Sequence, residues 1–313
     1  MERRYITDYF RLMRWQNLLF LVFLMWVMER VCAEVLYANG FYEILPWWYL
    51  VVLIGASVGV AAGGYIINDY FDIKIDRINR ADRLIVTQTI SKDEAMWAYR
   101  IATGIGIVLG LVASWIIRSW SMAVIFVFVP GLLWFYSSAY KRQFLLGNLI
   151  IALSAALPPI LLAIANVGWM DRHFAVIMPY LTWSKDLFYW MSGFALFAFL
   201  LTWIREIVKD LQDQAGDREL ECHTLPIVLG ETWTKIILTV LIIGTGCLIG
   251  YLAFMLRAKV AYPLLIPCCL AVLLVVEIGM LWAARIPTDY RRAQLLVKLT
   301  MFVGILYAFF LQF

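Results

Sequence analysis

The sequence predicts an all-α, polytopic membrane protein with nine transmembrane helices. Hydrophobic residues make up 64% of its 313 residues and charged residues only 15%, whereas soluble domains are roughly 45–50% apolar and about 25% charged. The apolar residues gather in runs that match a bilayer-spanning helix, which needs roughly 20 residues. These runs lack the alternation of apolar and polar residues that is typical of transmembrane β-barrels, so the spans are expected to be helical.

Nine runs are long and apolar enough to cross a bilayer. In chain order they cover residues 17–37, 46–67, 98–117, 120–139, 146–166, 187–204, 236–256, 261–284 and 294–312. The first run follows a charged segment and is full length, so we expect a retained span rather than a signal peptide. The runs leave little sequence for a soluble domain, and we therefore expect a single transmembrane domain over residues 1–313.

The distribution of Lys and Arg predicts the orientation of the spans, because cytoplasmic loops carry an excess of basic residues. With the N-terminus in the cytoplasm, 20 basic residues fall on the inner side and 6 on the outer side. The inner set is Arg3, Arg4, Arg11, Arg14, Lys74, Arg77, Arg80, Arg83, Lys92, Arg100, Lys141, Arg142, Arg205, Lys209, Arg218, Lys235, Arg285, Arg291, Arg292 and Lys298. The outer set is Arg30, Arg118, Arg172, Lys185, Arg257 and Lys259. The C-terminus is then outside, and the net charge of +4 reflects this bias rather than a nucleic-acid partner.

Two inner connections, 68–97 and 205–235, begin with similar acidic segments. The first segment reads NDYFDIKID from Asn68, and the second reads KDLQDQAGD from Lys209. At a constant offset of 141 residues, Asp69, Asp72 and Asp76 correspond to Asp210, Asp213 and Asp217. The pair indicates a diverged internal repeat, with halves of about 1–140 and 141–313, and such repeats often place a site between the halves of a membrane protein.

The spacing of these aspartates has a chemical consequence. On a helix, residues at i, i+3 and i+7 share one face, where three carboxylates repel each other unless a cation is bound. Asn68 shares the face of Asp72, and Glu206 lies one turn before Asp210. Oxygen ligands suit Mg²⁺, which usually takes one or two carboxylates and completes its coordination with water and substrate phosphates. We therefore expect two Mg²⁺ ions to bridge the acidic segments and a diphosphate; the alternative is a pair of solvated charged loops.

The expected metal ligands are Asn68, Asp69, Asp72, Asp76, Asp210, Asp213 and Asp217. No thiol or imidazole site is expected, because the cysteines show no zinc-type spacing and the chain has only two histidines.

Several basic and amide residues near the ends of the runs are candidates for substrate binding. Arg205 and Lys209 could bind a phosphate or simply balance the charge of the neighbouring acids. Lys141 and Arg142 follow Tyr140 at the inner end of a run and could bind an anion or only mark the cytoplasmic side. Arg14 and Asn17 open the first run, where an amide could bind substrate or hydrogen-bond to another helix.

In these residues the sequence resembles the UbiA-type prenyltransferase family. The family's NDxxDxxxD motif is matched by Asn68, Asp69, Asp72 and Asp76, and its second motif by Asp210, Asp213 and Asp217. Two weaker signatures are matched by Arg14 with Asn17, and by Tyr140, Lys141 and Arg142 with Asn148. The segment 205–217 is similar to the digeranylgeranylglyceryl phosphate synthase branch, which includes bacterial relatives. The resemblance covers nearly the whole chain.

The resemblance implies a nine-helix enzyme with two Asp-rich cytoplasmic helix-loops in a prokaryotic plasma membrane. It implies Mg²⁺-dependent transfer of a prenyl group from a prenyl diphosphate to a lipophilic acceptor, with the six aspartates as catalytic residues. The branch implies geranylgeranyl diphosphate as donor and a prenylglyceryl phosphate hydroxyl as acceptor. The substrate-binding residues would be Arg14, Asn17, Asn68, Tyr140, Lys141, Arg142, Asn148, Arg205 and Lys209.

Two other functions remain open at this stage. One is prenylation of an aromatic quinone precursor of the 4-hydroxybenzoate or naphthoate type. The other is a transporter or lipid-binding membrane protein, although the apolar runs carry few charges apart from Glu277, and transporters usually place charges near the bilayer midplane. Membrane lipid is an expected partner, and the sequence indicates no obligate protein partner and no nucleic acid.

Overall fold

The protein is all-helical over the residues that the computed structural model describes, which are 2–42, 44–79, 84–174, 183–255 and 264–311. Within these ranges the β-structure is limited to an isolated bridge between Val86 and Ile90. Among the described residues, eight helices are long and apolar enough to cross a membrane. The predicted all-α membrane fold class is therefore confirmed.

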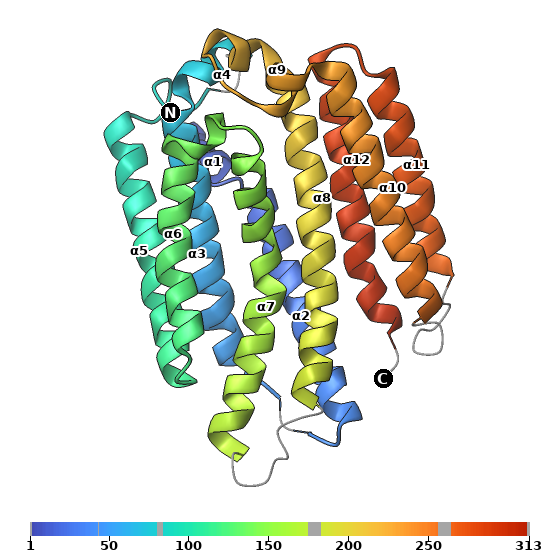
Figure 1. Cartoon of the computed structure of the whole chain (residues 1–313). Helices are drawn as coiled ribbons and strands as arrows, with labels where there is room; N and C mark the ends of the chain where they lie inside the picture. The colour runs from blue at the N-terminus through green and yellow to red at the C-terminus, as the bar shows by residue number, and fades with distance from the viewer. Residues whose placement is uncertain (1, 43, 80–83, 175–182, 256–263, 312–313) are drawn as a thin grey trace. The chain divides into compact units, whose positions relative to one another are not determined.

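The helices follow one another with short connections (Figure 1). In chain order they are α1 (Glu2–Leu12), α2 (Trp15–Ala38), α3 (Trp47–Phe71), α4 (Ile73–Asn79), α5 (Lys92–Ile116), α6 (Trp120–Ser138), η2 (Tyr140–Arg142), α7 (Leu146–Phe174), α8 (Trp183–Glu219), α9 (Leu225–Leu229), α10 (Glu231–Met255), α11 (Leu265–Ala283), α12 (Pro287–Leu306) and η4 (Tyr307–Phe310).

The chain divides into two compact units, each of which is described by itself. Unit 1 is Met1–Tyr140 with Pro158–Met191, and unit 2 is Lys141–Leu157 with Ser192–Phe313. One division falls within α7 at Pro158, the first of two consecutive prolines. Proline has no amide hydrogen, so it interrupts the hydrogen bonding of a helix.

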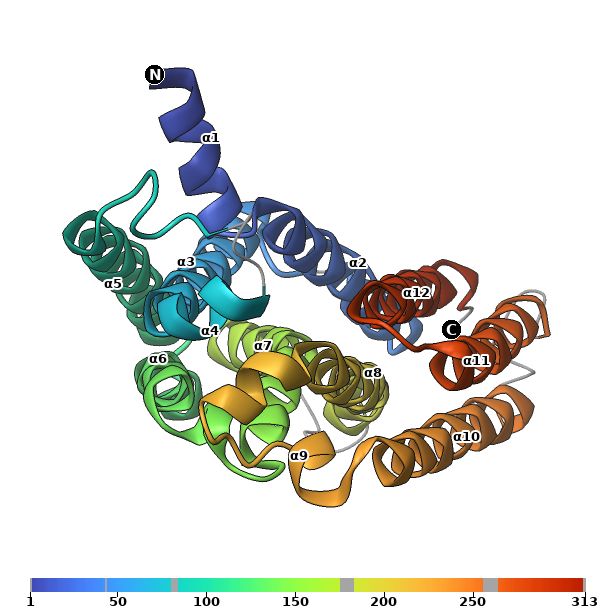
Figure 2. The ribbon, with the colours of Figure 1, turned by 90° about the horizontal axis from the view of Figure 1, so that it is seen from above.

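Unit 1 is built on close packing of α3 against α5. Figure 2 shows α3, α5 and α6 side by side and nearly end-on, and the three helices contact one another. A Cβ atom on Gly59 of α3 would lie 2.8 Å from the Cα of Gly106 in α5. Only glycine allows such an approach of two backbones, as in other membrane helix pairs. This packing supports the C-terminal end of α3.

Unit 2 has an apolar core formed by α8, α10, α11 and α12. Ile204 and Ile207 of α8 are fully buried in it, together with Leu238 of α10, Leu281 of α11 and Val297 of α12. These helices are apolar on all sides, as membrane spans are, and the Leu, Ile and Val side chains on their inward sides pack together to form the core. The core fixes the face that α8 turns inward.

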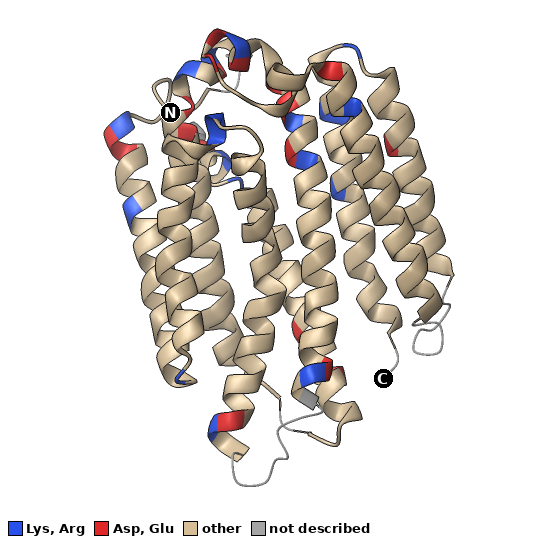
Figure 3. Cartoon of the chain, viewed as in Figure 1, with Lys and Arg blue, Asp and Glu red and all other residues tan. Residues whose placement is uncertain are grey.

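The positions of the charges agree with a membrane protein. In Figure 3 the Lys, Arg, Asp and Glu residues of the long helices lie mainly towards the helix ends, and the stretches between them carry few of these four residue types. The expected first span, 17–37, corresponds to α2, which carries Glu29, Arg30 and Glu34 and is not among the eight qualifying helices. Parts of the expected spans (256, 261–263 and 312) and the cations Arg80, Arg83, Arg257 and Lys259 lie outside the described residues.

Candidate active site

The first acidic segment occupies the end of α3 and the start of α4. Asn68 and Asp69 lie in the last turn of α3, Asp72 is the residue that follows the helix, and Asp76 lies in the first turn of α4. The helical hydrogen bonds continue across this junction: the Asp72 N–H donates to the Asn68 carbonyl at 2.9 Å, and the Asp76 N–H donates to the Asp72 carbonyl at 2.8 Å. The segment thus spans the end of one helix and the start of the next, with Asp72 between them.

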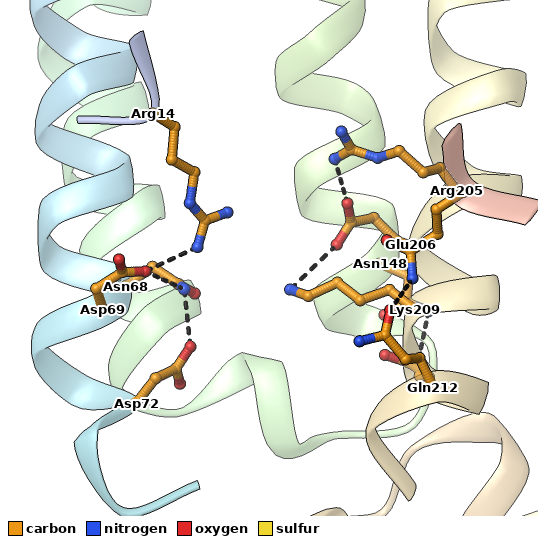
Figure 4. Close-up of polar contacts among 11 residues, drawn as sticks. Arg14, Asn68, Asp69, Asp72, Asn148, Arg205, Glu206, Lys209 and Gln212 are labelled. Carbon is orange, nitrogen blue, oxygen red and sulfur yellow. Dashed lines mark hydrogen bonds and ion pairs between the residues drawn. The ribbon is translucent and has the colours of Figure 1, made fainter. Parts of the chain in front are cut away.

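Asn68 holds the carboxylates of this segment. Its side chain is buried, and its Nδ2 lies 2.7 Å from Oδ2 of Asp72 and 3.5 Å from Oδ1 of Asp69 (Figure 4). A buried amide that donates to a carboxylate fixes its rotamer and partly offsets the loss of hydration. Asn68 therefore orients Asp72.

Arg14 reaches this segment from the break between α1 and α2. Its backbone is left-handed (φ 52°, ψ 52°), and its Nη2 lies 2.7 Å from Oδ1 of Asp69. Its guanidinium also lies 5.0 Å from the ring centroid of Tyr65. Burial lowers the pKa of Arg14, but Asp69 and Tyr65 outweigh this and raise the pKa above its ordinary value. Arg14 is thus a fixed cation beside Asp69. Asn17 lies one turn further along, with its N–H 2.8 Å from the Arg14 carbonyl.

The second acidic segment lies within α8. The sequence places 205–235 in a connection between spans, with Asp210, Asp213 and Asp217 on a helical face; in the structure α8 continues to Glu219, so these aspartates lie on the same helix as the span. The apolar run ends just before Arg205, but the residues that follow are good helix formers, so the helix continues. Glu206 and Asp217 are both close enough to Asp210 to repel its carboxylate. The predicted stacking of acidic side chains on one helix is present here.

Residues from other segments of unit 2 contact these carboxylates. Asn148 of α7 donates its Nδ2 to Oδ2 of Asp210 at 2.8 Å (Figure 4). The Thr224 hydroxyl donates to Oδ2 of the buried Asp217 at 3.1 Å. Lys141 is close enough to Asp217 to attract it. Two of the predicted substrate-binding residues, Asn148 and Lys141, therefore belong to this group.

Arg205 and Lys209 both pair with Glu206. Glu206 is buried, Arg205 donates to its Oε1, and Lys209 Nζ lies 3.9 Å from its Oε2 (Figure 4). The side chains of Arg205 and Lys209 are only 22% and 17% exposed. The charge balance that the sequence left as one possibility is therefore present.

The remaining predicted residues form a turn. Tyr140, Lys141 and Arg142 make up the short helix η2 between α6 and α7. The Arg142 carbonyl accepts a hydrogen bond from the N–H of His223 at 2.8 Å, which ties this turn to the segment after α8. The Tyr140 ring lies 6.3 Å from that of Phe135.

Sequence analysis missed three polar residues near the acidic segments. Thr224 was recognisable, because a Thr before Leu-Pro is typical of a helix N-cap. Tyr65 carries no such signal. Gln294 also carries none, although its Nε2 donates to Oε1 of Gln212 in α8 at 2.7 Å.

The residues present fit a hard cation by their chemistry. Within the described residues no three His, Cys, Asp or Glu side chains are grouped as a preformed metal site. Carboxylate and amide oxygens suit Mg²⁺, which needs only one or two protein carboxylates when phosphates and water supply the rest. Asp69 and Asp72 of unit 1, and Asp210 and Asp217 of unit 2, offer such oxygens.

Comparisons with known proteins agree with these observations. The family model described as the UbiA prenyltransferase family matches residues 31–306. Digeranylgeranylglyceryl phosphate synthase of Sulfurisphaera tokodaii is 32% identical over 244 residues, which cover 76% of this chain and 77% of that protein. Further synthases of the same name match over 52% to 86% of their own length.

Solved structures share the fold. One, from work on digeranylgeranylglyceryl phosphate synthase in membranes, has a TM-score of 0.66 and 23% identity and covers 98% of both chains. A UbiA homologue of Archaeoglobus fulgidus bound to DMAPP and Mg²⁺ has a TM-score of 0.60 and 16% identity, and covers 95% of this chain and 97% of that chain.

Proposed function

The chain belongs to the UbiA prenyltransferase family, and we propose that it transfers a prenyl group from a prenyl diphosphate to a lipophilic acceptor. The observation that carries the proposal is the oriented carboxylate group at the end of α3, where Asn68 and Arg14 hold Asp72 and Asp69. The named relatives support a geranylgeranyl donor and the hydroxyl of a prenylglyceryl phosphate as acceptor.

We assign metal binding to the acidic residues of both segments. The proposed ligands are Asn68, Asp69, Asp72, Asp76, Asp210, Asp213 and Asp217. Bound Mg²⁺ supplies electrostatic stabilisation of the diphosphate leaving group. The Archaeoglobus homologue, which binds Mg²⁺ together with DMAPP, supports this assignment.

Two residues of the chain hold these carboxylates in position for a cation. Asn68 fixes the orientation of Asp72, so little reorganisation is needed when a cation binds. Arg14 holds Asp69 in place through the 2.7 Å contact. The apolar helices exclude water, which would otherwise trap the allylic cation that forms when the C1–O bond to diphosphate breaks.

The acceptor hydroxyl then attacks C1 and forms an ether bond. Its proton passes to a carboxylate, to the released diphosphate or to water. We assign Arg205 and Lys209 to the acceptor's phosphate, because a phosphate monoester brings about two negative charges and these two cations lie one turn apart on α8. Arg14, Asn17, Asn68, Tyr140, Lys141, Arg142 and Asn148 complete the proposed substrate-binding set.

The proposed topology is a single domain with nine spans, in which α2 is the ninth. Both acidic segments and the N-terminus lie in the cytoplasm of a prokaryotic cell, and the C-terminus lies outside. Single cysteines at Gln214 and Arg172 test this proposal with a membrane-impermeant thiol reagent. Labelling of Gln214 from the outside would reverse the assignment.

The decisive experiment is an assay of purified protein with labelled prenyl diphosphates and a panel of acceptors. We expect geranylgeranylglyceryl phosphate to be prenylated with release of diphosphate, and turnover to stop in excess EDTA and return with Mg²⁺. Full turnover in EDTA would refute the metal assignment. Prenylation of 4-hydroxybenzoate or a naphthoate instead of the glycerol ether would keep the family and reject the acceptor.

A further inference from the structure

Helix α1 takes no part in the proposed reaction, yet it has a specific placement in unit 1. In Figure 2 the long helices α3 and α5 are seen nearly end-on and α1 is seen side-on, so α1 runs across the direction of the spans. Leu12 is fully buried against α3 and α5, and the Tyr5 hydroxyl donates to the carboxylate of Glu94 in the first turn of α5. Helix α1 therefore lies at the level where the α5 span begins, which is the headgroup level of a bilayer.

The side chains of α1 form three distinct faces. Asp8 and Leu12 face the protein, with 4% and 0% of their surface exposed. Ile6 and Phe10, one turn apart, are 58% and 52% exposed. Arg11 is rotated by about 100° from Phe10, and its side chain is 66% exposed. Because its partner Asp8 at 3.4 Å is buried, the exposed charge among the described side chains of α1, residues 5–12, is positive.

We propose that α1 is a surface-docking helix for anionic lipid headgroups, with Ile6 and Phe10 among the acyl chains and Arg11 at the lipid phosphates. An apolar stripe beside a basic stripe is typical of helices that lie in the membrane interface. Trp15 and Leu19 at the start of α2, the helix that follows α1, are also exposed, at 44% and 57%. In a membrane protein, exposed apolar side chains at this level have lipid as their neighbour.

Hydrogen–deuterium exchange of the full-length protein in nanodiscs tests this proposal. One nanodisc is phosphatidylcholine alone, and the other also contains phosphatidylglycerol. We expect the amides of residues 5–12 to exchange at least about fivefold more slowly in the anionic disc, the scale of attraction of one basic residue to an anionic surface. The Ile6→Asn/Phe10→Asn variant should lose the protection, and Arg11→Gln should reduce its dependence on lipid charge.

The conservative Ile6→Leu/Phe10→Leu variant is the matched control and should keep the protection. Unchanged exchange of α3 shows that each variant is folded. Equal exchange of α1 in the two discs would overturn the proposal. An unchanged lipid dependence in Arg11→Gln would also overturn it. The Arg11→Gln variant can be measured even if the Asn variant does not fold. The readout needs no turnover, so it is independent of prenyl transfer.

Discussion

The two acidic segments carry the same spacing of aspartates on different local structures. The first crosses a junction between two helices at Asp72, whereas the second lies within the unbroken α8. The first receives its cation, Arg14, from another part of the chain, whereas the second carries Arg205 and Lys209 on its own helix and pairs both with Glu206. Spacing in the sequence therefore determines which carboxylates are neighbours, but not how their charge is balanced.

The segments also share an unfavourable position. Asp69 lies in the last turn of α3 and Asp217 in the last turn of α8. A negative charge at a helix C-terminus opposes the helix dipole and costs about 0.3–1 kcal/mol, and neighbouring carboxylates add repulsion. Because a bound cation would relieve both costs, the position is physically reasonable for a metal-binding segment and unfavourable for a merely solvated one.

The largest expected effect is the loss of one central carboxylate from either segment. We expect Asp72→Ala and Asp213→Ala each to lower kcat by at least ~10²-fold, on the scale of removing one key electrostatic group, with the fold intact. The measurement is the steady-state rate across a Mg²⁺ titration. Asp93→Ala removes an exposed carboxylate outside both segments and serves as the control. A large loss in only one of the two variants would show that the segments are not equivalent.

Much of the fold could be predicted from the sequence, because hydropathy reports directly on burial in lipid. The run 46–67 became α3 (Trp47–Phe71), and the run 120–139 became α6 (Trp120–Ser138). The run 187–204 underestimated α8, because helix propensity continues past the last apolar residue. Hydropathy thus locates the spans well and the ends of their helices poorly.

The sequence indicated which residues to propose for the site, but it did not indicate the contacts between residues that are far apart in the chain. The aspartates and Asn68 follow from local spacing, which a helix converts into shared faces. The contacts of Arg14 with Asp69 and of Asn148 with Asp210 join residues far apart in the chain, and no local pattern encodes them. The left-handed backbone of Arg14 was likewise invisible, because nothing in its side chain favours that conformation.

The next effect concerns the cations that the second segment carries itself. We expect Arg205→Ala and Lys209→Ala to raise the KM for geranylgeranylglyceryl phosphate by about tenfold or more, since hydrogen bonds to charged groups contribute roughly 1.5–3 kcal/mol. The KM for the prenyl diphosphate should change much less, and an unchanged kcat would indicate loss of uniform binding. Arg218→Ala, an exposed cation on the same helix, is the control. If only the diphosphate KM rises, these cations serve the leaving group.

The smallest effect concerns the cation that the first segment receives from outside. Arg14→Ala and Arg14→Gly both remove the contact with Asp69, so both should lower kcat/KM to the same extent, with partial recovery in Arg14→Lys.

The Ala and Gly variants should differ in stability, because φ is 52° at this position. The left-handed conformation costs a non-glycine residue about 1–2 kcal/mol, whereas the added chain entropy of glycine costs about 0.5–1 kcal/mol. Unfolding in detergent should therefore show Arg14→Gly to be the more stable variant, by up to about 1.5 kcal/mol. Equal stability of the two variants would mean that the break before α2 is not strained, and that Arg14 is retained there for its charge alone.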